Sequence, residues 1–110
     1  MSKTSKPDYI GHRKRIKEKY KAGGLNGWLD YEVLEFALSY AIPRRDTKPI
    51  AKELLFEFKS INGVLNTDRK ELENIEGVSE HTALFLGFLK DIAILYLEKG
   101  LYNKDLVSSP

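Results

Sequence analysis

The chain has 110 residues, of which 42% are hydrophobic and 31% charged, and it contains no cysteine. This length supports one domain with a single core, and the composition is that of a globular protein rather than a disordered one. Disulfides and thiolate metal sites are excluded, and no apolar run approaches the roughly 18 residues of a membrane span. Because the N-terminus also lacks the apolar core of a signal peptide, we expect a cytoplasmic protein without membrane contact.

The positive charge is concentrated at one end of the chain. Residues 1–21 hold eight Lys or Arg against two acids, a net charge of +6. Residues 22–110 hold ten Lys or Arg against fourteen acids, a net charge of −4. A polyanion is therefore expected to be attracted first to the N-terminal part.

The first half of the chain shows helical periodicity and no alternation typical of strands. Residues 8–21 are expected to be helical, and the glycine-rich residues 22–29 to form a loop. Asp30 is the predicted N-cap of a second helix, in which apolar residues recur at i, i+1, i+4, i+5 and i+8. Pro43 is expected to end that helix.

A third helix is predicted after a short turn. Asp46 or Thr47 is its expected N-cap, and Pro49 lies in its first turn, where a missing amide costs little. Apolar side chains then recur as far as Phe58. Gly63 is interpreted as a short turn rather than as part of a helix.

Two helices are predicted in the last part of the chain. Thr67 or Asp68 is expected to cap a brief helix that ends at Leu72. Ser79 is the predicted N-cap of a long last helix that ends near Gly100. The fold class predicted from this order is all-α, a compact bundle of about five or six helices.

The same pattern suggests how the domain is bounded. Residues 1–7 are polar and end in proline, which predicts a mobile tail. Residues 8–100 are expected to form the domain, and residues 101–110 a linker or tail.

The last helix is apolar on most of its circumference. Between residues 83 and 97 only Lys90 and Asp91 carry charge. A helix with one face exposed to solvent would have a wider polar face. Two interpretations follow: a central helix packed by its neighbours, or a helix that docks a partner chain or a further domain.

The stretch "NIEGVSEHTALFL" at residues 74–86 is typical of a helix-hairpin-helix. In that motif the backbone amides of the turn and of the second helix's first turn point at one phosphate. Gly77, Val78 and Ser79 would be the contacting positions. Serine replaces the motif's second glycine, however, and Glu76 and Glu80 would repel an anion. The turn is thus either a phosphate grip or a purely structural hairpin.

Two basic segments offer alternative contacts for nucleic acid. One is the first helix, and the other is "IPRRDTKPIA" at residues 42–51, where two arginines precede a helix N-terminus. Their cations could neutralise phosphates without reading sequence. A solvated helix face, an acidic protein partner, or pairing of an arginine with Asp46 are the competing interpretations. The candidate DNA-binding cations are Arg13, Lys14, Arg15, Lys17, Arg44, Arg45 and Lys48.

No catalytic constellation is recognisable in the sequence. His12 and His81 are solitary, without the spacing of a His metal site, and no phosphate-binding glycine loop is present. We therefore expect no enzyme activity, no metal site and no cofactor.

Four stretches together resemble the N-terminal domain of RadC-type proteins, a family that bears the name "DNA repair protein". They are "GHRKRIKEKY", "LDYEVLEFALSYAIPRRDTKPIAKELL", "FKSINGVLN" and "ELENIEGVSEHTALFL". The resemblance covers about residues 9–97. Within it, the Tyr-Ala-Ile-Pro-Arg-x-Asp block and its distance to the hairpin are the most specific part.

The resemblance implies a helix-hairpin-helix domain that precedes a JAB-type metalloprotease-like domain. The His-x-His metal motif of that second domain does not occur in this chain, and "LVSSP" at residues 106–110 resembles the junction into it. Taken with the basic N-terminal segment and the hairpin, the resemblance predicts non-specific DNA binding linked to DNA repair. The alternative is a docking module for a JAB-type domain, or a surface for self-association, with no DNA binding of its own.

Overall fold

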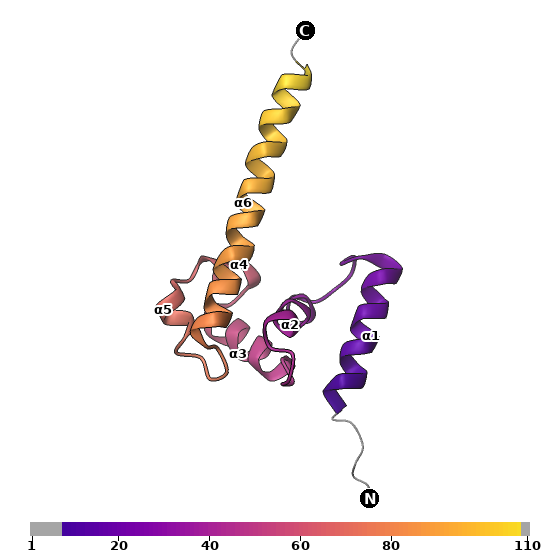
Figure 1. The fold of residues 1–110 in the computed structure, drawn as a ribbon, viewed down its shortest axis with the longest axis vertical. Helices are drawn as coiled ribbons and strands as arrows, with labels where there is room; N and C mark the ends of the chain where they lie inside the picture. Colours follow the sequence, from indigo (N-terminus) through magenta and orange to yellow (C-terminus); the bar gives the residue numbers. More distant parts are fainter. Residues whose placement is uncertain (1–7, 109–110) are drawn as a thin grey trace, which may run out of the picture.

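The computed structural model describes residues 8–108, which contain six helices and no strand (Figure 1). The expected all-α fold of five or six helices is confirmed. The tail predicted at residues 1–7 lies outside the described residues. The helices are α1 (Asp8–Gly23), α2 (Asp30–Ala41), α3 (Lys48–Phe58), α4 (Ile61–Asn66), α5 (Arg69–Leu72) and α6 (Glu80–Ser108).

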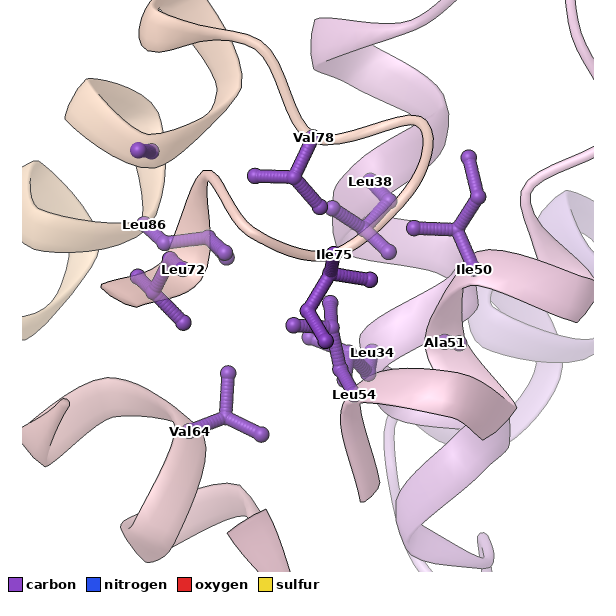
Figure 2. Close-up of a cluster of buried hydrophobic side chains, with 11 residues drawn as sticks. Leu34, Leu38, Ile50, Ala51, Leu54, Val64, Leu72, Ile75, Val78 and Leu86 are labelled. Carbon is purple, nitrogen blue, oxygen red and sulfur yellow. The ribbon is translucent and has the colours of Figure 1, made fainter. Parts of the chain in front are cut away.

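One hydrophobic core joins α2 through α5 to the first half of α6. The α5–α6 turn contributes two of its side chains, Ile75 and Val78, which point into this core (Figure 2). Helix α1 lies beside α2, at the edge of this bundle (Figure 1). The buried core residues are Leu34, Leu38, Ile50, Ala51, Leu54, Val64, Leu72, Ile75, Val78, Ala83 and Leu86.

Three of the four helix caps predicted from the sequence are confirmed. Asp46 Oδ1 accepts from the Lys48 amide at 3.1 Å, and Asp68 Oδ2 accepts from the Lys70 amide at 3.3 Å. At the start of α6, Ser79 Oγ accepts from the Thr82 amide at 3.3 Å. These side chains satisfy amides that have no partner inside their helices.

The start of α2 differs from the prediction. Asp30 is the first helical residue rather than the N-cap, which is Leu29. The carboxylate that satisfies this end belongs to Glu32, whose Oε1 accepts from the Leu29 amide at 3.0 Å. A glutamate three residues after the cap reaches back to the cap's amide, so it replaces Asp30 in this role.

The turn predicted at Gly63 is wrong, because Gly63 lies inside α4. Ser60 Oγ caps this helix by accepting from the Gly63 amide at 3.0 Å. A side chain at Gly63 would overlap the carbonyl oxygen of Phe58, the last residue of α3. Glycine therefore permits α4 to begin directly against the end of α3.

The predicted end of the last helix near Gly100 is also wrong, because α6 continues to Ser108. Every residue from 91 to 101 is exposed, and the helix projects away from the bundle (Figure 1). The expectation of a central helix packed by its neighbours therefore holds only for the first half of α6. The assignment of residues 101–110 as a linker stays a prediction.

Candidate nucleic-acid interface

Arg13 ties α1 to the turn between α2 and α3. Its guanidinium donates to the carbonyl oxygens of Pro43 and Arg45, each at 2.6 Å, and to that of Ile42 at 3.4 Å. Its Cζ also lies 5.2 Å from the centroid of the Tyr9 ring. Because these contacts use much of the guanidinium's donor capacity, Arg13 positions other groups rather than reaching outward.

The other predicted cations of α1 are free to meet a ligand. Lys14, Arg15 and Lys17 are exposed. They lie within four residues of Arg13, so they share the helical segment that Arg13 fastens to the turn. A fixed helix holds these three charges in a defined place relative to the arginines of that turn.

Arg44 and Arg45 of the turn are exposed as well. Among the side chains that the structure describes, neither forms an ion pair. The expected alternative, pairing with Asp46, is not found among the described side chains; Asp46 accepts from the Lys48 amide. Lys48 is half-buried, and its Nζ lies 5.6 Å from the centroid of the Tyr31 ring.

The α5–α6 turn lies next to Arg45. Gly77 has φ +94°, and a Cβ added there would lie 3.4 Å from Arg45 Nη1 and 2.8 Å from Ile50 Cδ1. Arg45 also lines a groove of about 590 Å³ with Pro49, Ile50, Glu53, Asn74, Ile75 and Glu76. The positive φ and the close packing on α3 thus explain why glycine occupies position 77, without any ligand contact.

The α5–α6 turn offers few free backbone amides to a phosphate. Val78 is 5% exposed, and its amide donates to the Ile75 carbonyl at 3.0 Å. This amide is therefore engaged within the turn, and its contact with a phosphate stays a prediction. The Ser79 hydroxyl serves as the α6 cap, and Glu76 and Glu80 are exposed beside the turn. These carboxylates make the turn a poorer anion site than the Arg44–Arg45 segment.

His12 and Glu35 form a contact that the sequence did not predict. His12 Nε2 of α1 lies 2.8 Å from Glu35 Oε2 of α2. The Glu35 side chain is 5% exposed, and burial raises the pKa of its carboxyl, with a smaller raising effect from nearby Asp46 and lowering effects from His12 and Lys48. Glu35 Oε1 has no hydrogen-bond partner among the described residues.

The available sequence signal for this pair was weak. Glu35 is the one charge in the apolar run "VLEFALSY" of α2, which marked it as unusual, but nothing indicated His12 as its neighbour. The pair and the Arg13 contacts lie on one side of α1, and both fix how α1 sits against α2 and the turn.

No group of three or more His, Asp or Glu within the described residues is arranged to hold a metal ion.

The projecting half of α6 forms a second, chemically different surface. Its apolar side chains extend around the helix rather than along one stripe, with Tyr96 75% exposed. None of the helices in residues 8–108 is long and apolar enough to cross a membrane. The large exposed apolar residues of this surface are Ile92, Ile94, Leu95, Tyr96, Leu97 and Leu101.

Comparison with known proteins finds UPF0758 proteins among the relatives of this chain. A UPF0758 protein of Fusobacterium nucleatum subsp. nucleatum is 43% identical over 103 residues, which cover 94% of this chain and 44% of that protein. A UPF0758 protein of Ruegeria pomeroyi is 36% identical over 104 residues, covering 94% of this chain and 46% of the relative. The chain is homologous to UPF0758 proteins.

These relatives confirm the expected likeness to the RadC family, but not a helix-hairpin-helix or a DNA contact. The chain spans less than half the length of the two curated relatives. No protein-family model matches the chain, and no solved structure matches it.

Proposed function

We propose that this chain is a RadC-like helix-hairpin-helix domain that contacts the nucleic-acid backbone without reading its sequence. Lys14, Arg15 and Lys17 of α1 and Arg44 and Arg45 of the turn form the contact surface, which we call the basic surface. Such a role agrees with the DNA-repair name of the RadC family and with the cytoplasmic location expected from the sequence.

The observation that carries this proposal is the set of Arg13 hydrogen bonds to the Ile42, Pro43 and Arg45 carbonyls. They join the two most basic segments of the chain, which lie about thirty positions apart. Exposed cations held on a common scaffold can each neutralise a phosphate. Gly77 lies beside the Arg45 side chain, at the edge of this surface, and contributes shape rather than charge.

Fluorescence anisotropy of labelled duplex and single-stranded DNA tests the proposal at two salt concentrations. We expect micromolar or weaker binding whose affinity falls as salt rises, because phosphate neutralisation releases condensed counterions. Replacing Lys14 and Lys17 together by Gln should reduce the slope of log K against log salt by about 1.5 to 2 for duplex DNA.

A matched control removes the same charge elsewhere. Lys70 of α5 and Lys99 of α6 are exposed and lie on elements away from α1 (Figure 1). Replacing both by Gln changes the net charge as much as the Lys14 and Lys17 double variant does. Because these two lysines lie outside the basic surface, most of the affinity and the salt slope should be unchanged. If both double variants lost the same DNA affinity, the effect would depend only on net charge, and a defined binding surface would be refuted.

The projecting half of α6 favours a second candidate, a docking module for a JAB-type domain or for another copy of this chain. Its apolar residues occupy a helix that the bundle does not cover. Exposed apolar patches of this kind mark interaction sites in soluble proteins. Ile92 and Leu95, which are 44% and 51% exposed, are the positions to test.

Size-exclusion chromatography with light scattering, over a range of concentrations, tests this candidate for self-association. If the α6 surface pairs two copies, Ile92→Glu with Leu95→Glu should restore a monomer. Phe56→Glu is the control, because Phe56 is 73% exposed on α3 and the change is chemically the same. For a JAB-type partner, the same variants are compared for co-elution with a separately produced JAB-type domain, and co-elution that survives the α6 variants would exclude this surface.

A further inference from the structure

Four aromatic rings from α1, the following loop and α2 form a group that we call the aromatic row, in which Tyr20, Trp28 and Phe36 contact one another and Tyr40 contacts Phe36. Tyr20 lies 6.2 Å from Trp28 and 5.7 Å from Phe36, and Trp28 lies 5.8 Å from Phe36, measured between ring centroids. Tyr40 extends the row at 5.5 Å from Phe36. Adjacent rings are tilted or edge-on, which is a favourable geometry for aromatic pairs.

This aromatic row is not part of the hydrophobic core. The core cluster contains none of the four rings. Tyr40 is 64% exposed and Tyr20 is 46% exposed, while Trp28 and Phe36 are half-buried. The residues that carry the two phenol rings are thus exposed, and both rings contact the half-buried Phe36.

Cations border the same row. Lys19 Nζ lies 5.2 Å from the centroid of the Trp28 ring and 3.0 Å from Glu32 Oε2. The exposed Lys17 and Lys21 flank Lys19 along α1. Through Tyr20, which follows Lys17 by three residues on α1, the aromatic row adjoins the α1 cations of the basic surface. Aromatic faces beside backbone-neutralising cations form the usual platform for single-stranded nucleic acid.

We propose that the aromatic row stacks the bases of a single-stranded nucleic acid whose phosphates lie on the basic surface. A duplex keeps its bases stacked inside, whereas a single strand can present unstacked bases to aromatic side chains. The chain then prefers single strands over duplexes, without strong dependence on base sequence. This inference rests on the proposed function and specifies its ligand.

The protein carries its own reporter for this contact. Trp28 is the single tryptophan of the chain and belongs to the row. Titration with an unlabelled oligothymidylate of about twelve nucleotides, a length within the range that such grooves cover, should change Trp28 emission saturably. A duplex of equal length should bind more weakly and change the emission less.

Variants at Tyr40 separate stacking from charge. Tyr40→Ala should weaken binding of the oligothymidylate by roughly 5- to 150-fold, the range for one lost stack, and leave duplex binding unchanged. Tyr40→Phe keeps the ring and should retain the affinity. Phe56→Ala, which removes an exposed ring on α3, is the control and should have no effect. Circular dichroism verifies that each variant is folded.

Each outcome decides between the two proposals. Salt-dependent binding that is equal for both DNA forms and unaffected by Tyr40→Ala would overturn the aromatic row and leave the basic surface standing. Saturated binding without any change in Trp28 emission would do the same. Absence of binding to both forms would overturn both proposals and leave the row as a protein-docking patch or as packing for α1.

Discussion

Gly77→Ala is expected to destabilise the fold strongly, because two independent effects meet at this position. Gly77 has φ +94°, where an L side chain is strained by about 1–2 kcal/mol. The added Cβ would also lie 2.8 Å from Ile50 Cδ1 and 3.0 Å from Ile50 Cγ1. Ile50 is 3% exposed and surrounded by core residues, so relieving this overlap costs a further 1–3 kcal/mol or so.

The combined loss is about 2–5 kcal/mol of unfolding free energy. For a domain of this size that corresponds to a fall in Tm of roughly 10–25 °C. Thermal and urea unfolding followed by circular dichroism measure it. Gly100→Ala is the matched control, because Gly100 lies in exposed helix with open space around it. That change should be neutral or stabilising by up to about 1 kcal/mol.

A double-mutant cycle with Ile50→Val isolates the steric part. Valine lacks the Cδ1 atom that the new methyl would meet, so the cost of Gly77→Ala should fall by about 1 kcal/mol or more in that background. An identical cost in both backgrounds, within about 0.5 kcal/mol, would refute the close packing of the turn on α3. A Gly77→Ala variant as stable as the parent would refute both parts of the reasoning.

Three further predictions concern the contacts that hold the helices in place. Arg13→Gln should lower the unfolding free energy by about 1–3 kcal/mol, because several carbonyl acceptors lose a charged donor; an unchanged urea midpoint would argue against this tie. Ser79→Ala should cost about 0.5–2 kcal/mol through loss of the cap on the Thr82 amide, whereas Ser79→Gly should cost less. The pKa of Glu35 is raised above its ordinary value of 4.5, so the native state keeps this proton to higher pH than the unfolded chain does. Its contribution is therefore fully present below about pH 4.5 and is lost as pH rises through the folded pKa. Relative to Glu35→Gln, the parent should become less stable over that rise in urea unfolding at several pH values, and a constant difference would contradict the burial effect.

Local signals in the sequence were sufficient for most of the helices. Apolar spacing located α2, α3 and the start of α6, and the polar residues Asp46, Asp68 and Ser79 marked where helices begin. Such signals act within a few residues, so they can be recognised along the chain. Gly63 was misleading, since glycine usually breaks helices, whereas here it allows α4 to approach the Phe58 carbonyl.

The tertiary structure decided what the candidate site consists of. Composition and charge identified the basic segments. Only the fold shows that Arg13 donates to carbonyls of the α2–α3 turn and that the Val78 amide donates to the Ile75 carbonyl within the hairpin. The contact between His12 and Glu35 and the aromatic row join residues from separate elements. Distant pairings of this kind depend on how the helices pack, and helix packing is set by the whole core rather than by any local pattern. The sequence by itself determined most of the helices, three of their caps and the family likeness, whereas packing decided which charges are engaged and which rings are exposed.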